Sequence, residues 1–160
     1  MKPNPAWLAA MTLAFFATTA SAEATDPLGE LLANVAHRTQ SILATFGLKV
    51  TLYHRGGRGI GSRDSLGCAV VAMRTAAVDG VKVKRHSVLF IKETVGLKMP
   101  DGSLHDGYWY ASDIGGAIGV GRIDLFTGDG AQSMAPLMSL NLTTLTVQKV
   151  GEFEGCPPTS

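Results

Sequence analysis

The fold is decided by residues 108–128, YWYASDIGGAIGVGRIDLFTG. Two segments rich in aromatic and branched residues, 108–111 and 122–126, predict short strands. Four glycines lie between them and allow backbone angles that other residues avoid. Asp113 and Asp124 stand at the two ends of this turn. If the strands pack as neighbours, the two carboxylates approach closely, and one of them stays protonated near neutral pH.

The rest of the chain is typical of a small β-barrel. Nineteen glycines against seven prolines in 160 residues favour turn-rich β structure over a helical bundle. The length fits one domain with its own hydrophobic core. Short apolar or alternating segments separated by glycine turns predict six or seven strands and hence a barrel. Besides the two above, these segments are 48–53, 68–74, 76–78, 87–92 and one or two strands within 138–150.

The first 22 residues are typical of a secretory signal peptide. Lys2 supplies a positive charge, residues 6–17 are nearly all apolar, and Ala20-Ser21-Ala22 fits the small-x-small cleavage pattern. Cleavage after Ala22 predicts an exported protein, periplasmic or secreted. The alternative, an uncleaved anchor, is disfavoured because the apolar run is shorter than the about 20 residues of a membrane span.

Residues 23–47 predict an amphipathic helix. Asp26-Pro27 offers an N-cap and a first helical residue, and Gly47 offers a stop. We expect the helix to pack on the side of the barrel domain, residues 48–156, or to close one end of it. A partner-binding or membrane-surface helix is the alternative, but a strongly basic face is missing. Pro157-Pro158 begins a tail, 157–160, that cannot extend a sheet.

The cysteines and the charge balance narrow the function classes. Cys68 and Cys156 predict one disulfide, because an even cysteine count in an exported chain makes pairing the default. Neither has the neighbours of a metal site or a cysteine nucleophile, and the histidines lack metal-ligand spacing, so we expect no metal and no cofactor. Without Lys2 the chain has 13 basic and 13 acidic residues, which disfavours nucleic acid as a partner.

The aspartates stand in surroundings that resemble a known family. Ala77-Val78-Asp79, the segment 87–91, the segment 111–118 and Arg122-Ile123-Asp124 look like the 3D (Asp-Asp-Asp) domain. That family is related to the C-terminal part of membrane-bound lytic transglycosylase A and, more loosely, to other double-psi β-barrels. The resemblance covers roughly residues 49–150. It departs from the family pattern at Gly119, where a lysine is usual, and at Val120, where a glycine is usual.

The resemblance implies a six-stranded double-psi β-barrel whose groove binds peptidoglycan glycan strands. It implies that Asp124 is the catalytic acid, Asp113 its supporting aspartate and Asp79 the first of the three. Both would hold Asp124 by hydrogen bonds and repel its negative charge. The implied reaction is that of a lytic transglycosylase, which forms 1,6-anhydro ends. Residues expected to contact the glycan are Trp109, Tyr110, Gly115, Gly116 and Arg122.

Structural interpretations of the same residues remain open. Asp79 precedes a glycine and fits a turn, Asp113 fits a cap on the glycine turn, and Asp124 fits a surface acid paired with Arg122. The basic loop at 54–63 is either a solvated loop or a contact for an anionic polymer. A non-catalytic barrel that binds peptidoglycan or supports an envelope assembly is therefore the alternative to the enzyme.

Overall fold

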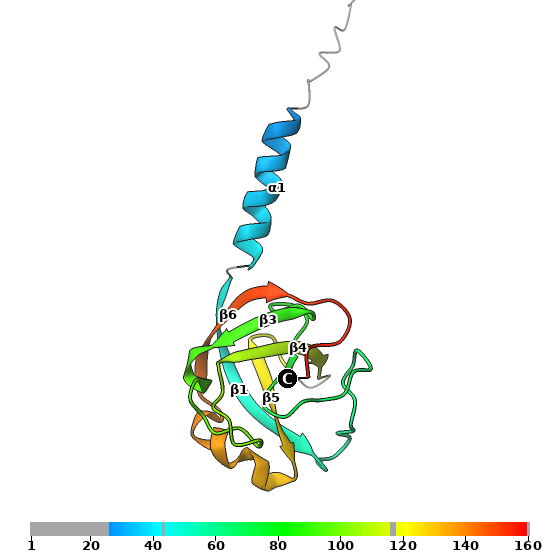
Figure 1. Ribbon diagram of the computed structural model, residues 1–160, viewed down its shortest axis with the longest axis vertical. Coiled ribbons are helices and arrows are strands. Elements are labelled where there is room, and N and C mark those ends of the chain that lie inside the picture. Colours follow the sequence, from blue (N-terminus) through cyan, green and yellow to red (C-terminus); the bar gives the residue numbers. More distant parts are fainter. Residues whose placement is uncertain (1–25, 43, 116–117, 160) are drawn as a thin grey trace, which may run out of the picture.

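The computed structural model describes residues 26–42, 44–115 and 118–159, so the predicted signal peptide lies outside the described residues. Six strands form one closed barrel in the order β1-β5-β2-β4-β3-β6 (Figure 1). This confirms the predicted six-stranded double-psi barrel. The strands are β1 (Thr45–Arg55), β2 (Thr75–Val78), β3 (Ser87–Ile91), β4 (Tyr108–Ile114), β5 (Arg122–Asp129) and β6 (Thr144–Glu152).

The strand order separates the two segments of the central motif. β2 pairs in parallel with β4 and antiparallel with β5, so it lies between them. The condition that 108–111 and 122–126 pack as neighbours is therefore not met. The segment that joins β4 to β5 must pass over the end of β2, and this crossing is the feature on which the site depends.

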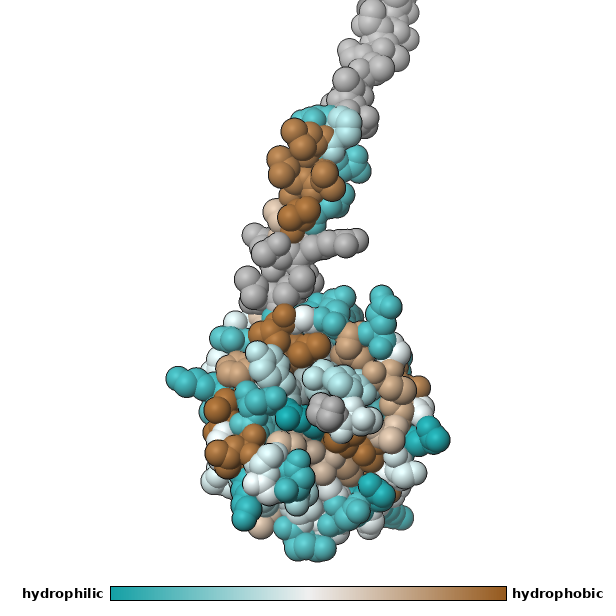
Figure 2. All heavy atoms as spheres, in the orientation of Figure 1, coloured by the Kyte–Doolittle hydropathy of each residue, from teal (hydrophilic) through white to brown (hydrophobic). Residues whose placement is uncertain are grey.

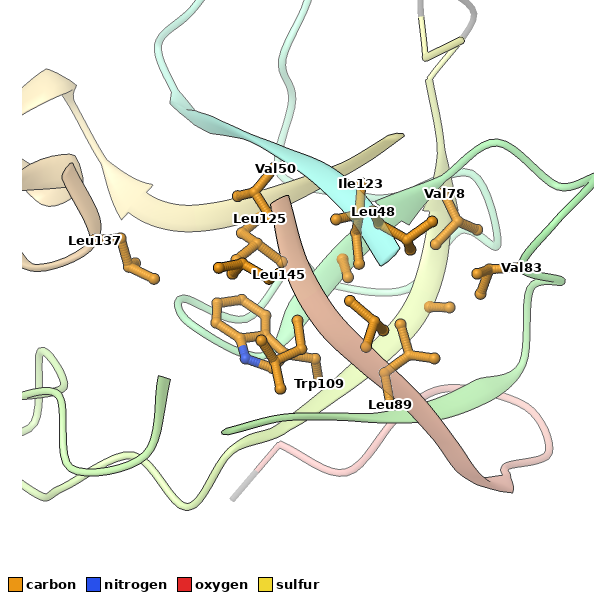
Figure 3. Close-up of a cluster of buried hydrophobic side chains, with 14 of the residues drawn as sticks. Leu48, Val50, Val78, Val83, Leu89, Trp109, Ile123, Leu125, Leu137 and Leu145 are labelled. Carbon is orange, nitrogen blue, oxygen red and sulfur yellow. The ribbon is translucent and has the colours of Figure 1, made fainter. Parts of the chain in front are cut away.

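Alternating side chains fill the barrel. Ile123 and Leu125 of β5 point inward and are fully buried, together with Leu48 and Val50 of the neighbouring β1 (Figure 3). Trp109 of β4 is also fully buried in this core, where its indole N–H donates to Thr94 Oγ1 at 3.0 Å. A buried aromatic side chain of this size stabilises a fold by about 3–5 kcal/mol relative to alanine. The inward alternation of these strands leaves the residues between them on the outer face of the barrel.

The N-terminal helix does not cover the barrel. α1 (Pro27–Ile42) extends away from the strands, and β1 begins at Thr45, so Gly47 lies in a strand and does not end the helix (Figure 1). Leu28, Leu31 and Leu32 are 64%, 59% and 61% exposed, and Figure 2 shows an apolar patch along this helix. The expectation that it packs on the barrel or closes one end is wrong. Within the described residues, no helix is long and apolar enough to span a membrane.

Two predicted strands have a different structure. The apolar run 68–74 forms a bridge and turns, with Met73 at a positive φ of 55°. In the region 138–150, the first residues belong to the 3₁₀ helix η2 (Ala131–Leu140), and a single strand follows. The predicted disulfide is present: Cys68 and Cys156 are bonded, with their Cα atoms 5.5 Å apart. It joins the 68–74 turn to the C-terminal tail.

Candidate active site

Asp113 and Asp124 lie on the same outer surface of the barrel, one strand on either side of β2. Ala77 of β2 pairs with Asp113 on β4 and with Asp124 on β5. Its neighbours Ala76 and Val78 belong to the core, so Ala77 faces outward. Two strand spacings put the backbones of the two aspartates about 10 Å apart. We call the outward residues Tyr53, Ala77, Asp113 and Asp124 the acid face.

Asp113 accepts three hydrogen bonds. Its Oδ1 accepts from the backbone N–H of Ser65 at 2.9 Å and from that of Ile114 at 2.9 Å. Its Oδ2 accepts from the Tyr53 hydroxyl at 3.4 Å. An ionised carboxylate is acceptor-only, so it satisfies three donors without leaving one unpaired. These three donors therefore hold the Asp113 carboxyl group in one position.

Asp124 has the opposite environment. Burial raises its pKa, the Arg122 guanidinium opposes that rise, and the negative charge of Asp113 adds to it, with a net increase above the ordinary value. Within the described residues no hydrogen-bond donor contacts its carboxylate. A half-buried carboxyl without donors beside a negative charge retains its proton to higher pH. Asp113 and Asp124 thus differ in their surroundings, since one is held by three donors and the other is half-buried without one in the described part of the chain, and such a contrast is expected of two carboxyl groups with different roles.

Tyr53 donates a hydrogen bond to Asp113, and the charges of both Asp113 and Asp124 act on its hydroxyl group. Burial raises the pKa of its hydroxyl well above the usual range, and the charge and hydrogen bond of Asp113, followed by the charges of Asp124 and Asp64, raise it further. The hydroxyl therefore remains protonated and acts as a donor. Its ring packs against Phe126 with centroids 5.2 Å apart.

Asp79 accepts hydrogen bonds from backbone N–H groups. Its Oδ1 accepts from the N–H groups of Val81 and Lys82, both at 2.8 Å, and its Oδ2 accepts from Gly121 N–H at 2.9 Å. Burial opposes ionisation, but these backbone donors outweigh it and lower the pKa of Asp79. Among the residues that the structure describes, no hydrogen bond joins Asp79 or Asp113 to Asp124, so the expectation that both hold Asp124 in this way is wrong. Asp79 instead fastens the crossing segment to the end of β2, directly before β5.

The segment 62–70 covers one side of the acid face. Asp64 is buried, and its Oδ1 accepts from Leu66 N–H at 3.0 Å and from Cys68 N–H at 2.9 Å. Its Oδ2 is buried without a hydrogen-bond partner among the described residues. Ser65, the next residue, is the one that donates to Asp113. The disulfide at Cys68 therefore anchors the segment that supplies a donor to the site.

Much of the basic loop is engaged within the protein. Arg55 Nε lies 2.9 Å from Asp129 Oδ1, and Arg63 donates to the Gly67 carbonyl at 2.6 Å. Arg58 is exposed. These contacts fit the solvated-loop interpretation better than a continuous anion-binding surface.

The residues expected to contact glycan fall into separate environments. Trp109 is fully buried, so its ring has no surface to offer a ligand, and this expectation is wrong. Tyr110 is half-buried and packs edge-on against Phe153 with centroids 5.7 Å apart. Arg122 is exposed two residues before Asp124. Gly116 lies outside the described residues, and Gly115 approaches Ile118 so closely that a Cβ there would lie 2.6 Å from its Cγ1.

Sequence reasoning missed three residues of the site. Tyr53 and Ser65 reach Asp113 from segments far away in the chain, at sequence separations of 60 and 48, and Asp64 lies directly before Ser65. Only the barrel topology brings them together. Among the described residues, no group of histidine, cysteine, aspartate and glutamate side chains has an arrangement that could hold a metal ion.

Solved structures that are similar to part of this chain include lytic transglycosylases. The chain matches no protein family model and no curated protein sequence. Each similarity covers part of this chain and only a minor part of a longer protein.

One of them is MltA of E. coli with bound chitohexaose, with 18% identity and a TM-score of 0.42 over 58% of this chain and 28% of that one. Another is LtgG of Burkholderia pseudomallei, with 22% identity and a TM-score of 0.39 over 56% and 26%. A third is a membrane-bound lytic murein transglycosylase of Agrobacterium tumefaciens, with 24% identity and a TM-score of 0.38 over 53% and 24%. The chain therefore spans less than a third of the length of these proteins.

Proposed function

We propose that this protein is an exported lytic transglycosylase that cleaves the bond between N-acetylmuramic acid and N-acetylglucosamine in peptidoglycan. Asp124 is its acid and base. The observation that carries the proposal is the contrast between the two aspartates: Asp113 accepts three hydrogen bonds, whereas Asp124 is half-buried with a raised pKa. The Cys68–Cys156 disulfide supports export to an oxidising compartment.

One carboxylic acid suffices for this reaction. Asp124 protonates the glycosidic oxygen as the bond to the muramic acid C1 breaks, and an oxocarbenium-like centre develops there. The C6 hydroxyl of the same sugar attacks C1 and forms the 1,6-anhydro ring. Its proton passes to the Asp124 carboxylate, which restores the acid. No water is consumed, so a second carboxylate is not needed as base or nucleophile.

The remaining aspartates have supporting roles in this proposal. Asp113 acts through its charge, which favours the protonated form of Asp124 before the reaction. Asp79 acts through the backbone, because its bond to Gly121 fixes the entry into β5 three residues before Asp124. The positive charge of Arg122 lies on the same strand and is available to a glycan substituent. Neither Asp113 nor Asp79 transfers a proton.

The test is to incubate the mature protein with purified peptidoglycan sacculi and to identify soluble products by mass spectrometry. Products with 1,6-anhydromuramic ends are expected from the wild type and not from Asp124→Asn. Glu154→Gln, a neutralised exposed acid near the C-terminus, serves as the matched control and retains activity. New reducing ends instead of anhydro ends would mean hydrolysis and would contradict the transglycosylase.

A non-catalytic peptidoglycan-binding barrel is the second candidate. It is favoured by Gly119, which stands where the resembling family has a lysine, so no cation projects from that position. This candidate predicts that wild type and Asp124→Asn sediment equally with sacculi and release nothing.

A further inference from the structure

A separate cavity of about 450 Å³ lies at the end of β5. It is enclosed by the end of that strand, the turn at 72–73, the hairpin at 98–100, η2 and one residue of β1. Its volume lies within the range of roughly 300–1,000 Å³ that is usual for small-molecule sites. We call it the β5 cavity. Its lining residues include Met73, Met99, Pro100, Phe126, Thr127 and Pro136.

The walls of the β5 cavity offer mostly apolar surface. Its two hydroxyl groups are engaged with the protein: Thr127 Oγ1 lies 3.1 Å from the Tyr53 carbonyl oxygen and 2.7 Å from Ser133 Oγ, which lies 2.7 Å from the Gly130 carbonyl oxygen. The two hydroxyl hydrogens are therefore taken up by these contacts. Such a lining suits methyl groups and a peptide backbone better than the many hydroxyls of a sugar.

The rim of the β5 cavity carries a surplus positive charge. Arg55 and Asp129, which both line the cavity, form an ion pair, with Nε and Oδ1 2.9 Å apart. Lys98 is exposed on the hairpin at 98–100 and has no ion pair within the described part of the chain. A ligand with a carboxylate would find a partner in Lys98 while its apolar part fills the cavity.

The β5 cavity begins next to the acid face. Phe126, one of its walls, follows Asp124 by two residues on the same side of β5, which is a distance of about 7 Å along a strand. Phe126 also packs against the Tyr53 ring, and Thr127 contacts the Tyr53 carbonyl. A molecule held at Asp124 can therefore place a substituent in the cavity.

We propose that the β5 cavity binds the peptide that peptidoglycan carries on the lactyl group of its muramic acid. This inference rests on the proposed function and names the substrate more closely, as peptide-bearing glycan. The peptide begins next to the sugar, contains small apolar side chains, and ends in free carboxylates. These properties match the position, the lining and the charge of the cavity.

The test compares two soluble ligands, a peptidoglycan tetrasaccharide with its peptides and the same tetrasaccharide after an amidase has removed them. Binding is measured by titration calorimetry with Asp124→Asn protein, so that neither ligand is cleaved. We expect the peptide-bearing ligand to bind about ten-fold more tightly, equivalent to about 1.4 kcal/mol. Adding Lys98→Met should remove most of that difference and leave the bare glycan unaffected. Lys92→Met, an exposed lysine outside the cavity, should leave both affinities unchanged.

Equal affinity for the two ligands, or an equal loss for both on Lys98→Met, would overturn the inference. Met99→Glu, which puts a negative charge on the wall of the cavity, is a second variant. It should also remove most of the difference in affinity between the two ligands. Wild type that forms anhydro ends equally well from both ligands would also overturn the inference and leave the proposed function intact. Binding of the free peptide, lost on Lys98→Met, without any cleavage of glycan would overturn the proposed function and support the peptide site.

Discussion

Reduction of the Cys68–Cys156 disulfide should lower the free energy of unfolding of the barrel by about 4–5 kcal/mol. The bonded cysteines are 88 residues apart in the chain. In the loop-closure model, releasing a loop of that length returns about 15 cal/mol/K of entropy to the unfolded chain, which gives this value at 25 °C. At an m-value of about 1–2 kcal/mol/M, the urea midpoint should fall by about 2–5 M.

The assay for this prediction is urea unfolding followed by tryptophan fluorescence. Trp109 is fully buried, and the other tryptophan, Trp7, belongs to the predicted signal peptide, so the mature chain has a single reporter in its core. A Cys68→Ala, Cys156→Ala double variant is the control, and its midpoint should not respond to reductant. A shift of less than about 1 kcal/mol on reduction of the wild type would refute the reasoning, because the unfolded chain would then gain little freedom.

Three further predictions concern single residues. Gly107→Ala should destabilise the fold by about 2–4 kcal/mol in the same assay, because the new Cβ would lie 2.6 Å from Phe90 Cε2 at a φ of +91°. Gly155 has a φ of +65° but open space around it, so Gly155→Ala should cost only about 1 kcal/mol. Asp79→Asn should cost about 1–2 kcal/mol at neutral pH, because the amide cannot accept from Gly121 and the turn together. Since the folded-state pKa of Asp79 is lowered, its stabilising contribution exists above the unfolded-state pKa and is lost as pH falls through the folded-state pKa. The free energies of unfolding of wild type and variant should therefore converge in acid. A constant difference between them down to about pH 2 would contradict this. Activity should fall as pH rises through the raised pKa of Asp124, and this limb should move to lower pH in Asp113→Asn and to higher pH in Arg122→Gln; shifts in the same direction would contradict the assigned charges.

The sequence predicted those parts of the fold that depend on local alternation. The strands at 48–53, 87–92 and 122–126 follow from alternating or branched residues, and the barrel follows from their number. The run 68–74 misled this reasoning because its apolar side chains are buried beneath a disulfide-anchored turn and not in a sheet. The helix was predicted five residues too long, because Gly47 is a strand residue opposite Thr146.

The site was predicted less completely because its geometry depends on strand order. Asp113 and Asp124 were found from their motif, but nothing in the motif indicates that β2 separates them. The side of β4 on which Asp113 lies could not be read from alternation either. An irregularity opposite Ala76 and Ala77 puts Asp113 on the outer face, while Trp109 and Ala111 remain in the core. Proximity of Trp109 to the motif in the chain therefore did not bring its ring to the acid face.

Ala77 has no functional group, yet it determines what lies between the two aspartates. Backbone hydrogen bonds fix the spacing of strands, so the gap from Asp113 to Asp124 cannot be adjusted gradually by side-chain changes. The content of the gap can be changed. A methyl group leaves the carboxyl groups without a bridge, whereas a serine hydroxyl at position 77 would offer a donor to the charged form of Asp124. One added oxygen atom on a short strand would then lower the pKa of Asp124, and the proposed acid would keep its proton only in more acidic surroundings.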